Sequence, residues 1–352
     1  MGEYKHSKLH HPEMKRQILW RKAHISTQEY GIYYIDKRTG VSKKYPHIVP
    51  FESWQETLYS GIRTELLIYI NVPGQEIKAH DGVHNLLSSW VLCANLYFLT
   101  KIDNRYRALL VEFLKQKVSD QITEITDVEL EFAFPEDDDL HPKPLLGEST
   151  GTRGKKQTSP DVAFKVKTND GKDGVILTEV KYTEHHFYAC STNPETAKNE
   201  SRNLNPDFSR CMKPAKGYDY KQICHQKNAW QRKYMDLITF SAESEEVLQC
   251  CPAATDGYQL FRQQALAEGI AKSRRFDLVV SSVAFDGRNE DLIACMKSSG
   301  IDNFQTDWAP LFVGKALFKT WTHQEWVQFV RDNQKNGEFD EWLEYVNGRY
   351  GY

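Results

Sequence analysis

The chain has 352 residues, of which 40% are hydrophobic and 12% aromatic, so it can bury a substantial core and a disordered protein is excluded. No run of 18 or more apolar residues occurs, and the polar start of the chain lacks the apolar stretch of a secretion signal, so neither a membrane span nor export is expected. Seven cysteines in such a chain predict reduced thiols and a cytoplasmic location.

The net charge of −3 excludes a globally basic protein, but positive charge is concentrated locally. Residues 151–182 hold seven Lys and Arg against four Asp and Glu, and residues 201–233 hold eight against two. A nucleic-acid enzyme needs only a local positive groove over an acidic metal site. Because 26% of the residues are charged, a solvated surface also forms such clusters by chance, and both interpretations stay open.

The first part of the chain predicts short elements. Residues 1–25 are polar and basic and predict an arm or a first helix. Residues 30–50 contain a strand-like aromatic run, followed by a turn at 38–40. Residues 66–72 (LLIYINV) predict a further strand.

Two helices and a strand are expected next. Apolar residues recur at three- and four-residue spacing from Val83 to Phe98, and a second helix is expected over about 104–118. Residues 127–134 alternate, which predicts a strand. Four apolar side chains are expected on one face of this strand: Val128, Leu130, Phe132 and Phe134.

A long loop is expected over residues 135–160, and loops of that length are usually functional or disordered. Two strand-like runs follow, at 161–168 and 174–182, and the turn between them, Asn169-Asp170-Gly171-Lys172-Asp173-Gly174, predicts an antiparallel hairpin.

Helices are expected over 220–240 and about 256–273 in the last part of the chain. The continuous apolar run 276–285 is typical of a buried central strand. Thr322 and Glu325 have the spacing of a capping box, which predicts the start of another helix.

The predicted hairpin carries the residues that suggest a function. Pro160-Asp161 begins its first strand, and Glu179-Val180-Lys181 ends its second. Because side chains alternate along a strand, Glu179 and Lys181 share one face, and the hairpin can bring Asp161 beside them. An ordinary edge hairpin with solvated charges is the alternative, but the apolar run 175–177 before Glu179 favours a buried site, where charges must be paired or metal-bound.

These residue types suit the hydrolysis of a phosphodiester. The carboxylates of Asp161 and Glu179 are expected to bind Mg²⁺, which keeps several waters and bridges to phosphate oxygens. The metal lowers the pKa of a bound water and neutralises phosphate charge. Lys181 is expected to orient that water or to stabilise the developing charge.

The pattern resembles the PD-(D/E)XK, or restriction-endonuclease-like, nuclease superfamily. It looks closest to a bacterial family of restriction endonucleases, some of them associated with Argonaute-related (PIWI-type) proteins. The resemblance covers roughly residues 75–285, and Trp90 departs from it where Gln is expected. The motifs that carry it are Ser88-Ser89 with Asn95, Leu146-Gly147-Glu148 with Thr152-Arg153-Gly154, Ser159-Pro160-Asp161, Glu179-Val180-Lys181-Tyr182-Thr183-Glu184 and Tyr258-Gln259-Leu260-Phe261-Arg262-Gln263-Gln264.

The resemblance implies an α/β protein with a restriction-endonuclease-like αβββαβ core, in which helices flank a mixed central sheet. The core is expected over 81–290, between an N-terminal accessory region (1–80) and a C-terminal helical extension (291–352). The resemblance also implies Mg²⁺ as cofactor, with Mn²⁺ able to substitute, and cleavage that leaves a 5′-phosphate and a 3′-hydroxyl.

A further catalytic carboxylate is also implied by the resemblance. The candidates are Glu112, Glu131 and Glu148. We favour Glu148, because it lies near Arg153 in the loop that leads to Asp161, although an exposed loop glutamate explains it as well.

Nucleic-acid contacts are expected from two sets of residues. One is the basic loop, with Arg153, Lys155 and Lys156, and the other is the helix after the core. In that helix, Arg262, Gln263 and Gln264 are candidates for contacts to the scissile phosphate or the DNA backbone. A plain amphipathic helix, packed through its apolar side chains, is the alternative.

Cysteines and histidines between 185 and 225 do not predict a zinc site. His185-His186, Cys190, Cys211 and Cys224-His225 match no standard ligand spacing.

The sequence therefore predicts a DNA endonuclease of the restriction or phage-defence type. A repair or RNA-processing nuclease of the same superfamily, or a catalytically idle nucleic-acid-binding module, is the alternative. A homodimer would suit the cleavage of both strands. An Argonaute-like protein, a helicase or a methyltransferase is a candidate partner.

Overall fold

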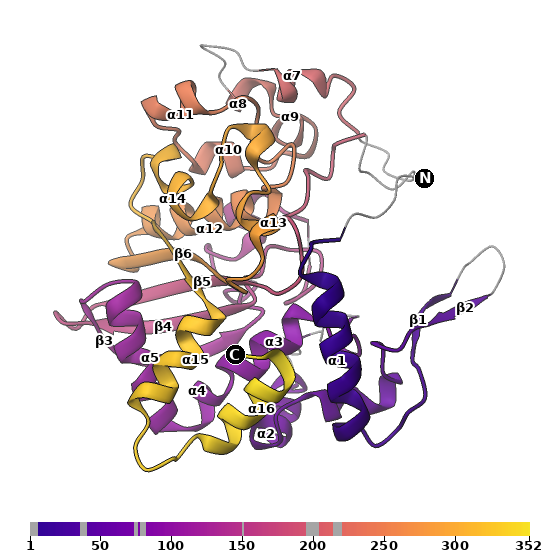
Figure 1. The fold of residues 1–352 in the computed structure, drawn as a ribbon. Coiled ribbons are helices and arrows are strands. Elements are labelled where there is room, and N and C mark those ends of the chain that lie inside the picture. The colour runs from indigo at the N-terminus through magenta and orange to yellow at the C-terminus, as the bar shows by residue number, and fades with distance from the viewer. Residues whose placement is uncertain are drawn as a thin grey trace.

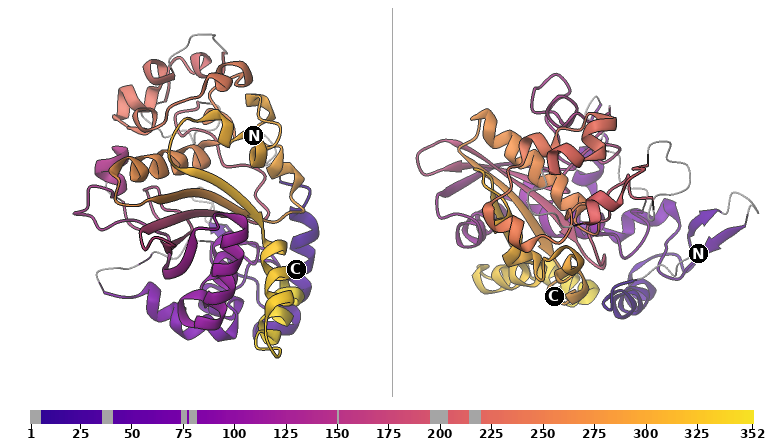
Figure 2. Two further views of the ribbon diagram at one scale, coloured as in Figure 1. Left: turned by 90° about the vertical axis from the view of Figure 1, so that its left-hand side faces the viewer. Right: turned by 90° about the horizontal axis from the view of Figure 1, so that it is seen from above.

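The computed structural model describes residues 6–35, 41–73, 77, 82–149, 151–194, 204–213 and 220–352. Within these ranges, a five-stranded sheet lies between two groups of helices (Figures 1 and 2). The strand order is β3-β4-β5-β6-β7. The strands are β3 (Ile122–Leu130), β4 (Val162–Thr168), β5 (Asp173–Lys181), β6 (Leu278–Phe285) and β7 (Leu317–Thr322).

The sheet is mixed. Strands β3, β4 and β5 pair antiparallel, whereas β5, β6 and β7 pair parallel. Every residue of β6 is buried, as its continuous apolar run predicts. The expected fold class, a restriction-endonuclease-like core with a mixed sheet flanked by helices, is confirmed.

Alternation along β5 divides the core into two hydrophobic clusters, one on each face of the sheet. Ile176 and Val180 belong to the first cluster, and Val175 and Leu177 belong to the second. Glu179 and Lys181 follow Val175 and Leu177 at two-residue spacing along β5, so these two charged residues point toward the second face.

The first face is covered by helices from both ends of the chain, which lie side by side in Figures 1 and 2. They are α1 (His10–His24), α2 (Ser60–Ile70), α3 (Ser89–Tyr97), α4 (Leu99–Ile102), α5 (Asn104–Lys117), α15 (His323–Asn333) and α16 (Asp340–Tyr350), with the 3-10 helix η1 (Phe51–Thr57). A small hairpin of β1 (Ile32–Ile35) and β2 (Ser42–Lys44) projects beside them (Figure 1).

The second face is covered by α12 (Tyr258–Ser273) and a set of short helices. These are α6 (Pro142–Leu146), α7 (Ser209–Met212), α8 (Tyr220–Ile223), α9 (His225–Trp230), α10 (Tyr234–Leu237), α11 (Ala242–Val247), α13 (Glu290–Ile293) and α14 (Phe304–Asp307), with η2 (Lys297–Ser299) and η3 (Ala309–Leu311). None of the helices in the described ranges has the length and apolar character to cross a membrane.

Several expected elements are confirmed. A first helix is present at His10–His24, inside the expected range 1–25. The helix over 104–118, the hairpin, the helix over 256–273 and the strand over 276–285 are present within a few residues. The capping box of Thr322 and Glu325 is formed at the start of α15. The expected turn at 38–40 lies outside the described residues.

Other expectations are wrong. Residues 66–70 of the strand expected over 66–72 belong to α2, in which Ile62, Leu66 and Ile70 are buried at helical spacing. The helical spacing begins at Ile62, before the residues 66–72 from which the strand was inferred. The apolar run 66–72 alone therefore did not distinguish a helix from a strand. The helix expected from Val83 begins only after Ser88, whose side chain accepts a hydrogen bond from the Val91 N–H.

The strand expected over 127–134 ends at Leu130, and its apolar residues do not share a face. Glu131 has a φ of 49°, which turns the chain. Val128 and Leu130 therefore pack in the first cluster, while Phe132 and Phe134 pack in the second.

The remaining differences concern the segments around the core. The expected loop over 135–160 contains α6, and the expected helix over 220–240 is broken into α8, α9 and α10, with Gln231 in a left-handed conformation between the last two. The C-terminal segment, expected to be helical, also contributes the edge strand β7.

Candidate functional site

The hairpin of β4 and β5 brings Asp161, Glu179 and Lys181 together. Asp161 precedes β4, and its Oδ2 accepts a 2.7 Å hydrogen bond from the Val180 N–H. The Lys181 Nζ donates to Glu179 Oε1 at 2.6 Å. The antiparallel register, in which Val162 pairs with Thr178, produces this arrangement.

These carboxylates open into a polar cavity of about 230 Å³ between the hairpin, the loop before it and α12. Its walls are formed by Glu131, Gly154, Gln157, Thr158, Ser159, Pro160, Asp161, Glu179, Gln259, Arg262 and Gln263. Three carboxylates and three amide side chains make the cavity rich in oxygen.

Burial perturbs the ionisation of these groups. Burial, with the neighbouring Glu179 charge, raises the pKa of Asp161 well above its usual range. Burial, with the charges of Asp161 and Glu179, does the same to the pKa of Glu131. Burial alone would lower the pKa of Lys181, but the charges of Glu179, Glu184 and Asp161 outweigh it and leave that pKa raised. The site therefore stabilises positive charge and penalises additional negative charge.

Glu131 is the third carboxylate in the cavity wall, whereas the sequence interpretation favoured Glu148. Glu148 is not in the wall, because its oxygens accept hydrogen bonds from the Thr158 N–H at 2.6 Å and the Tyr234 hydroxyl at 2.7 Å. It also lies 3.6 Å from Arg262. Glu148 thus holds the loop and α12 together beside the cavity.

Gln259 is a site residue that the sequence interpretation missed. Its Oε1 accepts a 2.9 Å hydrogen bond from Lys181 Nζ, and the amine also lies over the rings of Phe187 and Tyr188. The amine is therefore held from several sides. The signal was available, since Gln259 belongs to the first turn of a correctly predicted helix, but only the tertiary packing shows which of its polar residues reaches the lysine.

The three candidates from α12 have different surroundings. Arg262 lines the cavity, and its Nε donates to Thr158 Oγ1 at 2.9 Å. Gln263 also lines the cavity but is only 2% exposed. Gln264 is 1% exposed, does not line the cavity and donates to Glu268 at 3.3 Å. Of the three, Gln264 is therefore the least accessible for the DNA contact expected from the sequence.

The basic loop also separates into two kinds of residue. Arg153 is half-buried and tied to the protein by bonds to the carbonyls of Glu131 and Leu130 and an ion pair with Glu129. Lys155 and Lys156 are exposed at a tight turn. Of these three cations, the two lysines have the accessibility that contact with a nucleic-acid backbone requires.

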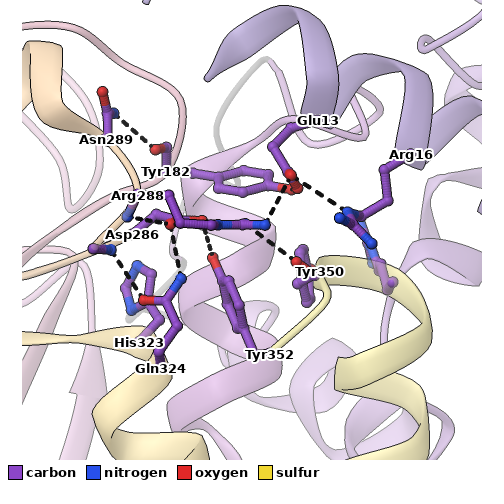
Figure 3. Close-up of polar contacts among 12 residues, drawn as sticks. Glu13, Arg16, Tyr182, Asp286, Arg288, Asn289, His323, Gln324, Tyr350 and Tyr352 are labelled. Carbon is purple, nitrogen blue, oxygen red and sulfur yellow. Dashed lines mark hydrogen bonds and ion pairs between the residues drawn. The ribbon is translucent and has the colours of Figure 1, made fainter. Parts of the chain in front are cut away.

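A buried polar network anchors the chain just beyond Lys181 (Figure 3). The Tyr182 hydroxyl donates to Glu13 of α1 at 2.7 Å, and Asn289 donates to the carbonyls of Tyr182 and Glu184. Arg288 joins the two acidic members of the network, Glu13 and Asp286. The end of β5 is thus fixed to α1 and to the segment after β6, which holds Glu179 and Lys181 in place.

The cysteines considered for zinc lie elsewhere. Cys190, Cys211 and Cys224 line a small apolar cavity together with Cys251. All seven cysteines are free thiols. Across the described ranges, no three His, Cys, Asp or Glu side chains stand in the arrangement of a metal site.

A mixed sheet flanked by helices, with a Pro-Asp and Glu-x-Lys constellation on its antiparallel hairpin, defines the restriction-endonuclease-like class. The chain belongs to the family described as Restriction Endonuclease associating with ARP, whose model matches residues 20–351. The resemblance inferred from the motifs is thereby confirmed, and it indicates a nuclease. No curated protein and no solved structure matches the chain.

Proposed function

We propose that the protein is a metal-dependent endonuclease that hydrolyses DNA phosphodiester bonds, in restriction or defence against phage. The observation that carries this proposal is the meeting of Asp161 and Glu179 in one polar cavity, with Lys181 hydrogen-bonded to two residues of its wall, Glu179 and Gln259. Membership in a restriction-endonuclease family supports it.

The residues of the cavity fit a hydrated Mg²⁺ ion. Asp161 and Glu179 would hold it, in keeping with the preference of Mg²⁺ for one or two carboxylates with several retained waters. Burial and the Glu179 charge raise the pKa of Asp161, and a bound cation would offset both effects. When bound, the ion would neutralise phosphate charge and lower the pKa of a bound water; Mn²⁺ prefers similar ligands and could substitute.

The protein's own groups have distinct tasks in this proposal. Lys181, fixed by Glu179 and Gln259, presents a permanent positive charge to the position of the reacting phosphate. Arg262 provides a second cation at the cavity wall. Glu131 takes the part of the additional carboxylate in preference to Glu148, because it lines the cavity.

DNA would approach across the basic loop, with Lys155 and Lys156 as contacts to the backbone. The family description names association with ARP, and an Argonaute-related protein is therefore the partner we propose first. A helicase or methyltransferase partner, and a homodimer that cuts both strands, are further proposals. The protein is proposed to act in the cytoplasm.

The test is cleavage of supercoiled plasmid with Mg²⁺ or Mn²⁺ by the wild type and by Lys181→Ala. Lys167→Ala, at a half-exposed lysine paired with Asp173 on the same hairpin, is the matched control. We expect cutting by the wild type and the control but not by Lys181→Ala, with circular dichroism showing that all three proteins are folded.

Two outcomes would overturn the proposal. Undiminished cutting by folded Lys181→Ala would remove the lysine from the reaction. DNA binding by the wild type without cutting would indicate an idle binding module. Single-stranded DNA and RNA substrates, tested in parallel, distinguish the restriction function from repair and RNA processing.

A further inference from the structure

The side-chain amide of Gln263 has a fixed orientation. Its Nε2 donates to the carbonyls of Leu177 at 3.2 Å and Ser282 at 2.9 Å, and lies 3.1 Å from the Ser281 hydroxyl. Rotating the amide by half a turn would place its oxygen against two carbonyl oxygens, which offer no hydrogen. The oxygen of Gln263 must therefore point away from β5 and β6.

That oxygen has no donor within the protein. Among the described residues, no group donates a hydrogen bond to the buried Gln263 Oε1, although the side chain is only 2% exposed. A buried acceptor without a donor is destabilising, and at a cavity wall a ligand or water can satisfy it. Gln263 lines the cavity that also contains Asp161 and Glu179.

The Gln263 oxygen needs a hydrogen-bond donor as its partner, and this excludes for this atom the phosphate contact that the sequence led us to expect. Phosphodiester oxygens only accept hydrogen bonds, and so does the amide oxygen of Gln263. A water molecule has hydrogens to donate, and a water polarised by a cation donates strongly.

We propose that Gln263 is a positioning residue that accepts a hydrogen bond from a water ligand of the cation held by Asp161 and Glu179. This inference rests on the proposed function and deepens it. Gln157 supports it, because its Oε1 is a second buried acceptor without a donor in the wall of the same cavity. The two amides extend the oxygen-rich lining beyond the carboxylates that would bind the ion directly.

Gln264 provides a matched control for the experiment. It is the next residue on α12, it is equally buried, and its Oε1 also lacks a donor, but it lies outside the cavity. Gln263→Leu and Gln264→Leu therefore make the same chemical change at two adjacent buried positions. The loss of packing and of amide hydrogen bonds is shared, and only the first variant alters the cavity.

The first measurement is Mn²⁺ binding by electron paramagnetic resonance, which requires no catalysis. We expect Gln263→Leu to weaken Mn²⁺ binding roughly fivefold or more, and Gln264→Leu to leave it unchanged, since one hydrogen bond to a polarised water is lost in the first variant alone.

The second measurement is plasmid cleavage at saturating DNA. Gln263→Leu should lower kcat about tenfold or more with little change in KM, because a misplaced water affects the reaction rather than DNA binding. Equal Mn²⁺ affinities in the wild type and folded Gln263→Leu would overturn the inference, as would equal losses in Gln263→Leu and Gln264→Leu. A wild type that binds Mn²⁺ but does not cut would refute the proposed function while the binding comparison still decides the role of Gln263.

Discussion

Replacing Asp286 by alanine tests whether the buried network of Figure 3 stabilises the fold. Asp286 follows β6 and is completely buried. Its carboxylate accepts hydrogen bonds from the Arg288 Nε at 2.9 Å, Gln324 Nε2 at 2.7 Å and the Tyr352 hydroxyl at 2.8 Å. The substitution removes one charge and leaves three donors from different parts of the chain without their acceptor.

The expected cost follows from the partners that remain. Removing one member of a buried ion pair typically costs about 3–5 kcal/mol, because the other charge is left unpaired. Arg288 keeps Glu13 at 3.0 Å, and about a third of its side chain is exposed to water. We therefore expect the lower end of that range, a loss of about 3 kcal/mol in the free energy of unfolding.

The assay is urea unfolding at pH 7, with Asp291→Ala as control. Asp291 pairs with Lys8 on the surface, where such pairs contribute about 0–1 kcal/mol. Burial alone would raise the pKa of Asp286, but hydrogen bonds and charge from Arg288 outweigh it and hold that pKa below its usual value. Because the pKa of Asp286 is lower in the folded protein than in the unfolded chain, its carboxylate stabilises the fold fully at a pH above the unfolded-state pKa. This stabilisation disappears as the pH falls through the folded-state pKa. A cost below about 1 kcal/mol at pH 7, or a cost that grows in acid, would refute the reasoning.

Three further predictions concern stability and the cation. Burial lowers the pKa of His323 to about 4, so the unfolded chain takes up a proton at a higher pH than the folded protein does. The free energy of unfolding of the wild type should therefore fall by about 2–3 kcal/mol between pH 6.5 and 4.5. His323→Gln should lack this component of the pH dependence in the same urea titration. Gly300 has a φ of 85°, and a β-carbon there would overlap the Val247 carbonyl, so Gly300→Ala should cost more than about 2 kcal/mol. Gly171→Ala, with a φ of 75° in open space, should cost only about 1 kcal/mol, and equal thermal shifts would contradict this difference. Under the proposed function, EDTA should abolish plasmid cutting without unfolding the protein, and added Mg²⁺ should restore it.

Much of the fold was predictable because its elements have strong local patterns. The hairpin of β4 and β5 and the helix α12 have the periodicity expected of them, and β6 is a continuous apolar run. The strand β7 was missed because it is a partly exposed edge strand, without a continuous apolar run or a regular alternation. The helix α2 was mistaken for a strand because its apolar residues at 66–70 also suit a buried strand.

The site divides in the same way. The sequence by itself determined that Asp161, Glu179 and Lys181 would meet, because hairpin register and side-chain alternation are local geometry. Only the tertiary structure decided that Glu131 rather than Glu148 lines the cavity, that Gln259 holds the lysine, and which amide oxygens are left without a donor. Those outcomes depend on how a loop and a helix from distant parts of the chain pack over the sheet, and no spacing within one segment specifies that packing.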